Sequence, residues 1–134
     1  MSVRGFDHWA ITVESIERTL TFYRRVLGCE VLYEDLWRAG QIPIVSLRLG
    51  VNVINVHEAG REGSPRARRP TPGSADFCLR WDAPLSRAIE LLGRHGVAVE
   101  AGPVPRPAAD GKPGQSVYFR DPDGNLLELL STEG

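Results

Sequence analysis

The chain has 134 residues, of which 42% are hydrophobic and 25% charged, a composition that fits one compact globular domain or two small fused halves. Sixteen lysine and arginine residues against seventeen aspartate and glutamate residues give a formal net charge of -1, so no positive field favours nucleic acid as a partner. No apolar run approaches the roughly 18 residues that cross a bilayer, which predicts a soluble, cytoplasmic protein without a membrane partner.

The first half of the chain reads as strand, helix and three strands. Residues 6–13 alternate between bulky apolar and more polar side chains, which predicts a strand with one buried face. Ser15 can cap a helix whose apolar residues recur at helical spacing, and Gly28 supplies its end. Three strand-like runs follow over residues 30–36, 42–49 and 51–57.

The second half repeats this order after a segment rich in Gly, Arg, Ser and Pro over residues 58–72, which we expect to link two modules. The pattern predicts a helix over residues 84–92 and a loop over residues 101–114. It predicts strands over residues 76–81, 97–100, 116–120 and 126–130. The sequence therefore predicts an α+β fold of two tandem βαβββ modules, residues 5–60 and 73–131, within a single domain.

An internal alignment of the two halves identifies equivalent polar positions. Superposing their first strands places His8 over Asp76, and superposing their last strands places Asn55 over Glu128. Strand alternation puts these residues, together with His57, on the face opposite the bulky apolar side chains.

Four of these five residues, His8, His57, Asp76 and Glu128, carry imidazole or carboxylate groups, which are costly to bury without a partner. A divalent cation satisfies all of them, and mixed N/O ligation suits Mn, Fe, Ni or Zn. Each residue also has a structural interpretation. His8 can be an ordinary strand histidine, and His57 and Glu128 can be solvated. Asp76 can form an ion pair with Arg80, which lies two positions further along the same face of the strand.

A second group of polar residues is expected on the same face, where it can bind an anionic small-molecule ligand or substrate. Arg48, Arg80, Tyr118 and Asn55 form this group, with Ser46 beside them. The alternative is that the arginine stems only extend to solvent at the rim of a cavity.

Three motifs carry a family resemblance: Phe6-Asp-His8, the helix end Phe22-Tyr-Arg-Arg-Val-Leu-Gly28, and the run from Tyr118 to Glu128 that contains Asp-Pro-Asp-Gly-Asn. The chain resembles the vicinal oxygen chelate superfamily, which includes glyoxalases, bleomycin-resistance proteins and dioxygenases. The segments 55–61 and 69–76 further resemble a glyoxalase-domain subgroup labelled virulence-associated. The resemblance implies two modules whose sheets curl around a central metal-centred pocket, commonly in a homodimer.

By resemblance, His8 matches the first-strand metal ligand and Glu128 the last-strand ligand, whereas Asp76 and Asn55 replace the family's usual histidine and glutamate. We expect a metal-dependent glyoxalase-like lyase or isomerase in which Glu128 is both ligand and proton shuttle. The alternatives are a dioxygenase of the same superfamily and a metal-free, bleomycin-resistance-like protein that binds a small molecule.

Overall fold

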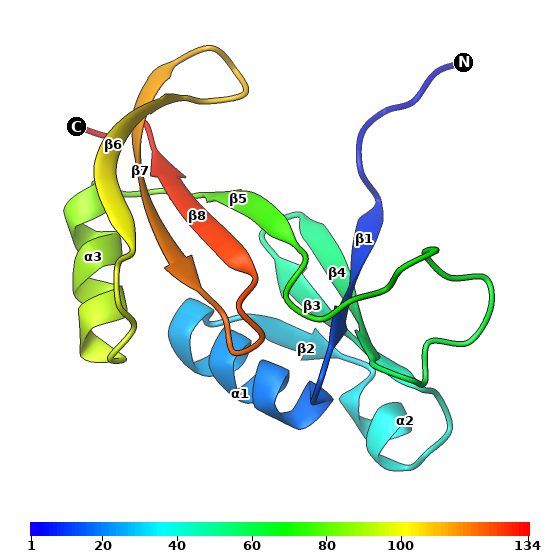
Figure 1. Ribbon diagram of the computed structural model, residues 1–134. Coiled ribbons are helices and arrows are strands. Elements are labelled where there is room, and N and C mark those ends of the chain that lie inside the picture. Colours follow the sequence, from blue (N-terminus) through cyan, green and yellow to red (C-terminus); the bar gives the residue numbers. More distant parts are fainter. The chain divides into compact units, whose positions relative to one another are not determined.

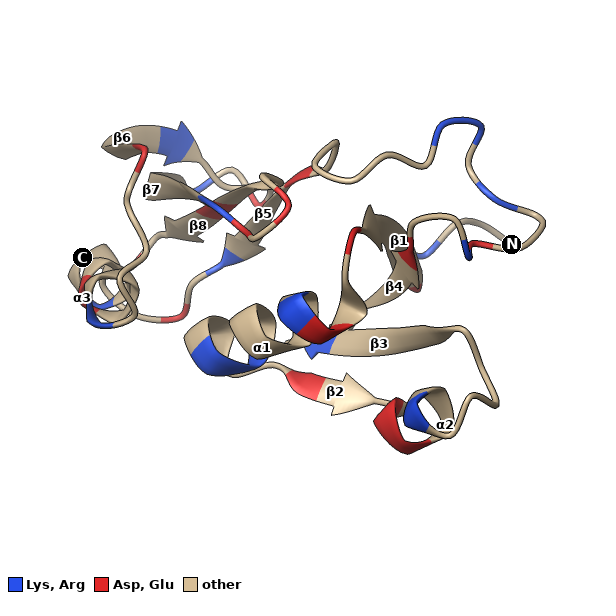
Figure 2. Cartoon of the chain, turned by 60° about the horizontal axis from the view of Figure 1, so that its bottom comes forward, with Lys and Arg blue, Asp and Glu red and all other residues tan.

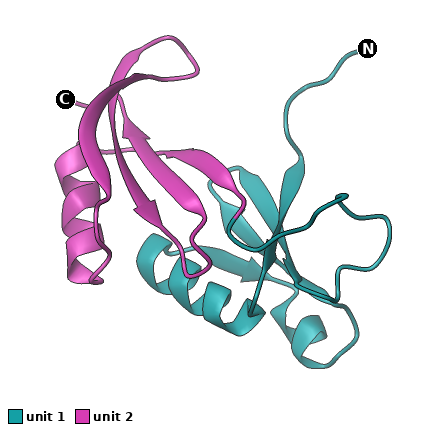
Figure 3. Cartoon of the chain, viewed as in Figure 1, with its two compact units in different colours: residues 1–73 teal, residues 74–134 magenta.

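A computed structural model describes residues 1–134, which form two compact units, residues 1–73 and residues 74–134 (Figure 3). Each unit holds one four-stranded sheet, so the α+β class and the two tandem modules predicted from the sequence are confirmed. No helix is long and apolar enough to cross a membrane.

Unit 1 contains four strands and two helices (Figure 1). The strand order is β1-β4-β3-β2, with β1 parallel to β4 and the other neighbours antiparallel. The elements are β1 (His8–Val13), α1 (Ile16–Leu27), β2 (Glu30–Leu32), α2 (Glu34–Arg38), β3 (Ile44–Leu49) and β4 (Asn52–Glu58).

Helix α1 begins and ends where the sequence predicts. The Ser15 hydroxyl accepts a hydrogen bond from the Arg18 backbone N–H at 3.2 Å, and Gly28 ends the helix at φ 65°, a conformation that glycine adopts without steric cost. The helix and sheet share a core, because alternate residues of β1 and β4 are buried together with one side of α1. The largest fully buried side chains of this unit are those of Val13, Ile16, Leu20, Tyr23, Val45, Leu47, Ile54 and Val56.

The strand expected over residues 30–36 ends at Leu32, and the short helix α2 follows it. Tyr33 adopts φ 67°, which breaks the extended conformation. Glu34 then accepts hydrogen bonds from Arg24 at 2.6 Å and from Arg38 at 2.7 Å, while Arg38 also contacts both carboxylate oxygens of Glu17. These charge-assisted contacts, not an apolar pattern, stabilise the helical turn.

Unit 2 repeats the arrangement with the strand order β5-β8-β7-β6, in which β5 and β8 are parallel. Helix α3 packs on β7 and β8, and its buried residues Leu85, Ala88 and Leu92 face the core. The elements are β5 (Asp76–Arg80), α3 (Leu85–Arg94), β6 (Ala101–Pro107), β7 (Pro113–Arg120) and β8 (Leu126–Ser131).

Strand β6 corrects the sequence analysis, which placed a strand at 97–100 and a loop at 101–114. Residues 97–100 form no regular element, and the strand instead runs through three prolines at positions 103, 105 and 107. β6 lies at the edge of its sheet, where one side of the backbone has no strand to pair with, so a proline there removes no ladder hydrogen bond.

The register of the two sheets agrees residue for residue with the internal alignment. His8 pairs with Val53 in unit 1, and Asp76 pairs with Leu126 in unit 2, so Asn55 and Glu128 occupy equivalent positions. An ion pair is repeated as well. Glu30 and Arg48 lie 3.4 Å apart in unit 1, and Glu100 and Arg120 lie 2.9 Å apart at the equivalent place in unit 2. The structure thus supports an internal duplication.

Candidate functional site

The polar face of unit 1 carries His8 on β1 and, on β4, Asn55 and His57, as alternation predicts. His8 is half exposed, and its Nδ1 lies 2.7 Å from the Asp7 carboxylate. A carboxylate at Nδ1 favours the tautomer with the proton on that atom and leaves Nε2 as the free acceptor. His8 is therefore oriented as a histidine ligand or base commonly is.

The side chains at the centre of this face bond to one another and carry no unpaired charge. The buried Ser46 donates a hydrogen bond of 2.7 Å to Oδ1 of Asn55, on the neighbouring strand. Arg48, two residues along β3, is engaged by Glu30. His57 differs, because its Nδ1 atom is buried and has no hydrogen-bond partner. A buried ring nitrogen without a partner is a site that a proton donor or a cation would satisfy.

The polar face of unit 2 has an ionisable centre. Cys78 on β5, Glu128 on β8 and Tyr118 on β7 are direct neighbours across the sheet and form what we call the central row of unit 2. Partial burial and the adjacent Glu128 carboxylate raise the pKa of the Cys78 thiol to about 12. The thiol therefore stays protonated at neutral pH and is a hydrogen-bond donor beside Glu128, not a thiolate.

Asp76 and Arg80 do not form the ion pair that the sequence offered as an alternative. Arg80 instead donates a 2.7 Å hydrogen bond to the Thr132 hydroxyl and lies 3.4 Å from the Asp110 carboxylate. Asp76 is exposed at the start of β5, on the same face as Glu128. Its carboxylate is thus left open to a ligand, whereas the guanidinium of Arg80 is occupied.

The Asp-Pro-Asp-Gly-Asn turn positions this face. The buried Asp121 carboxylate accepts hydrogen bonds from the backbone of Asp123 and Asn125 and from the Asn125 side chain, at 2.8 to 3.0 Å. Asn125 in turn accepts one from the Ala75 backbone at 2.9 Å. The turn therefore holds the start of β5, and with it Asp76, beside β8.

One functional candidate was missed by the sequence analysis. Arg106 on β6 donates from Nε to the Tyr118 hydroxyl at 3.0 Å, and its guanidinium lies 5.7 Å from the centre of the Tyr118 ring. It therefore belongs to the polar face that carries Glu128. Figure 2 shows a blue, basic segment on β6. The only signal in the sequence was the alternation of Arg106 with the flanking prolines.

The residues predicted to hold a metal divide evenly, His8 and His57 in unit 1 and Asp76 and Glu128 in unit 2. No three His, Cys, Asp or Glu side chains gather as a metal site in the structure. The donor set nevertheless fits a divalent ion in its chemistry, because it combines two imidazoles with two carboxylates. The unpartnered Nδ1 of His57 and the free Nε2 of His8 support the same fit.

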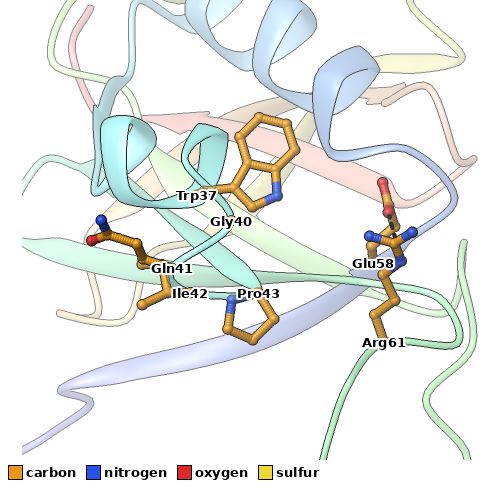
Figure 4. Close-up of a pocket in the computed structure, with 7 residues that line it drawn as sticks. All are labelled: Trp37, Gly40, Gln41, Ile42, Pro43, Glu58 and Arg61. Carbon is orange, nitrogen blue, oxygen red and sulfur yellow. Dashed lines mark ion pairs between the residues drawn. The ribbon is translucent and has the colours of Figure 1, made fainter.

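Two surface pockets contain none of the predicted site residues. One of about 250 Å³ in unit 1 is lined by Trp37 and the Glu58–Arg61 ion pair, among other residues (Figure 4). Glu58 also accepts a hydrogen bond from the first backbone N–H of α1, at 3.2 Å. Its charge is thus balanced within the protein. The second pocket, of about 540 Å³, lies in unit 2 between α3, the prolines of β6 and the C-terminal residues.

Comparison with known proteins gives one family. The model of the Glyoxalase/Bleomycin resistance protein/Dioxygenase superfamily matches residues 5–129. Virulence protein STM3117 of Salmonella typhimurium is 37% identical over 129 residues, covering 96% of this chain and 85% of that protein. Its crystal structure has a TM-score of 0.87 over 98% of each chain.

Two further relatives are similar to almost the whole chain. Glyoxalase domain-containing protein RDO1 of Mycosarcoma maydis is 40% identical over 131 residues, which are 98% of this chain and 70% of that protein. A structure from the mobile metagenome of V. Pseudocholerae is 37% identical with a TM-score of 0.89, covering 100% of this chain and 98% of that one.

Proposed function

Because the chain belongs to the Glyoxalase/Bleomycin resistance protein/Dioxygenase superfamily, we propose that it is a metal-dependent, glyoxalase-like lyase or isomerase acting on a small oxygenated molecule. One observation carries the proposal. Glu128 is a partly buried carboxylate at the centre of a polar face, and it forms no ion pair with a lysine or arginine. A carboxylate in that position is stabilised by a cation from outside the chain.

In this proposal His8, Asp76 and Glu128 would hold a divalent ion, with His57 as a fourth candidate. Mn, Ni, Zn and Fe all suit these donors. The ion would supply Lewis-acid polarisation of a substrate carbonyl or enolate oxygen. Glu128 accepts a proton from the substrate and returns it. The protonated Cys78 thiol lies beside this carboxylate on the neighbouring strand, where it can donate a hydrogen bond to it. Asp7 fixes the ring orientation of His8.

Metal affinity tests the ligand set without a known substrate. We expect His8→Ala and Glu128→Ala to bind manganese, nickel and zinc at least about tenfold more weakly than the parent, measured by calorimetry after chelator treatment. His95→Ala is the matched control, since His95 ends helix α3 and belongs to neither polar face. Equal affinity in all four proteins would place the metal elsewhere or show that none is bound.

A metal-free binding protein is the second candidate, and the neutral Ser46–Asn55 pair favours it, because these residues stand at the position equivalent to Tyr118 and Glu128. Metal analysis of protein purified without chelator separates the two. A substoichiometric metal content with retained small-molecule binding would select this candidate. Strict dependence of turnover on ferrous iron and dioxygen would instead identify a dioxygenase of the same superfamily.

We also propose a homodimer, because each sheet has open edge strands that a second copy could cover and closed symmetric dimers are the commonest oligomers. Sedimentation measures it directly. A monomer that persists from micromolar to millimolar concentrations would contradict this part of the proposal.

A further inference from the structure

The arginines of the two sheets differ in what neutralises them. Arg48, Arg80 and Arg120 each lie within 3.4 Å of a carboxylate oxygen. Arg106 has no such partner. Its Nε donates to the Tyr118 hydroxyl, and its NH1 donates to the carbonyl of its own neighbour, Pro105, at 2.8 Å. Both acceptors are neutral, so no carboxylate of the chain pairs with the Arg106 guanidinium.

The guanidinium of Arg106 lies close to the central row of unit 2. Its backbone pairs with Gly114 on β7, yet its guanidinium reaches Tyr118, four residues further along the same strand and face. Tyr118 is the direct cross-strand neighbour of Glu128. The uncompensated guanidinium therefore lies one side chain away from the proposed proton-transferring carboxylate.

The backbone of β7 approaches those of β6 and β8 closely at Gly114, the cross-strand partner of Arg106. A side chain at Gly114 would place its first carbon 2.8 Å from the Ser131 carbonyl oxygen and 3.1 Å from that of Arg106, so only glycine allows this approach. Ser116, between Gly114 and Tyr118 on the same face, is fully buried. The Tyr118 hydroxyl and ring then hold the guanidinium through a hydrogen bond and a cation–π contact.

We propose that Arg106, held by Tyr118, binds the carboxylate of an anionic substrate, which makes the substrate a small oxygenated carboxylic acid. An arginine whose terminal N–H groups have no anionic partner is suited to a carboxylate, because its fork matches the two carboxylate oxygens. The reaction on that acid rests on the proposed function above, whereas the binding of the carboxylate does not require a metal.

The test uses lactate and its uncharged counterpart lactamide, titrated into the full-length chain before and after chelator treatment and followed by the NMR shifts of residues on β6, β7 and β8. We expect saturable shifts around Arg106 and Tyr118 with lactate and none with lactamide. Arg106→Gln should weaken lactate binding at least about tenfold, the loss of one charge-assisted fork.

Arg120→Gln is the matched control. It removes the same charge from the adjacent strand, but Glu100 already engages this arginine, so lactate affinity should change by less than about twofold. Arg106→Lys keeps the charge and loses the fork, and we expect intermediate affinity from a protein whose fold the spectra confirm. Equal binding of lactamide, equal weakening by Arg120→Gln, or no saturation with lactate would each overturn the proposal. Loss of metal binding alone would overturn only the proposed function.

Discussion

The three residues at the centre of the polar face have the same strand pairing in the two units but different side-chain chemistry. In unit 1 the row consists of Ala10, Asn55 and Ser46, which are small and neutral, and the Ser46 hydroxyl donates a hydrogen bond to the Asn55 side chain. In unit 2 the same three places hold Cys78, Glu128 and Tyr118. The strand pairing and the flanking Glu–Arg ion pair recur in both units. Duplicated strands can therefore keep one frame while acid–base groups gather in one copy.

The largest expected difference between the units is the effect on turnover of replacing Glu128 and its counterpart Asn55. With a substrate in hand, Glu128→Gln should lower turnover by about 10²–10⁴-fold, as the loss of a general base does. Asn55→Ala, at the equivalent place in unit 1, removes at most a neutral hydrogen bond and should cost about tenfold or less. Steady-state kinetics at saturating metal measures both. Similar losses at the two positions would show that the units share the chemistry.

The hairpins at the ends of the rows also differ between the units. Asp121→Ala leaves buried backbone donors without a partner and should lower the free energy of unfolding by about 2–3 kcal/mol. In unit 1 the corresponding turn depends on Gly50, whose φ is 60° with open space around it. Gly50→Ala should therefore cost only about 1 kcal/mol. Urea denaturation gives both values, and a larger cost at Gly50 would reverse the contrast.

The alkylation rate of the Cys78 thiol reports the effect of the Glu128 charge on the pKa of this thiol. Partial burial and the Glu128 charge raise the pKa of its thiol to about 12, so iodoacetamide, which can reach the thiol, should modify it slowly at pH 8. In Glu128→Gln the negative neighbour is lost, the pKa falls, and the rate should rise several-fold. Cys29, buried in unit 1 and far in sequence from Glu128, is the internal control and should not respond. An unchanged rate at Cys78 would mean that Glu128 contributes little to the raised pKa of this thiol.

The smallest expected effect concerns α2, which has no counterpart in unit 2. Hydrogen bonds from Arg38 lower the pKa of Glu17, and those from Arg24 and Arg38 lower the pKa of Glu34, below the ordinary 4.5. Because these pKa values are depressed in the folded chain, the stabilisation is present above pH 4.5 and is lost as the pH falls through the lowered values.

Arg38→Ala should therefore reduce the melting temperature slightly at pH 7 and by less at pH 3, as followed by circular dichroism. Arg25→Ala, a neighbouring basic residue of the last turn of α1, is the control and should have the same small effect at both pH values. A pH-independent loss in Arg38→Ala would indicate lost packing on Trp37 instead of lost ion pairs.

The faces of the strands could be predicted from the sequence, because side-chain direction in a strand has a period of two. His8, Asn55, Asp76 and Glu128 were assigned to their faces on that basis alone. Helix α2 could not be predicted, since its stabilising charges come from residues up to 21 positions away. Arg106 was missed for a related reason. Its strand was expected to be a loop, and a loop residue cannot be assigned to a face.

Strand β6 also constrains how this chain can meet other chains. The Ala108 backbone N–H donates to Lys112 across the hairpin, so by alternation the N–H positions of residues 105 and 107 point to the open side. Both are prolines and have no hydrogen to offer. A foreign strand arriving at this edge finds carbonyls without the donors that a continuous ladder needs, which discourages amyloid-like growth of the sheet. We therefore expect a second copy that covers a sheet edge to pair with β1, β2 or β5 and not with β6.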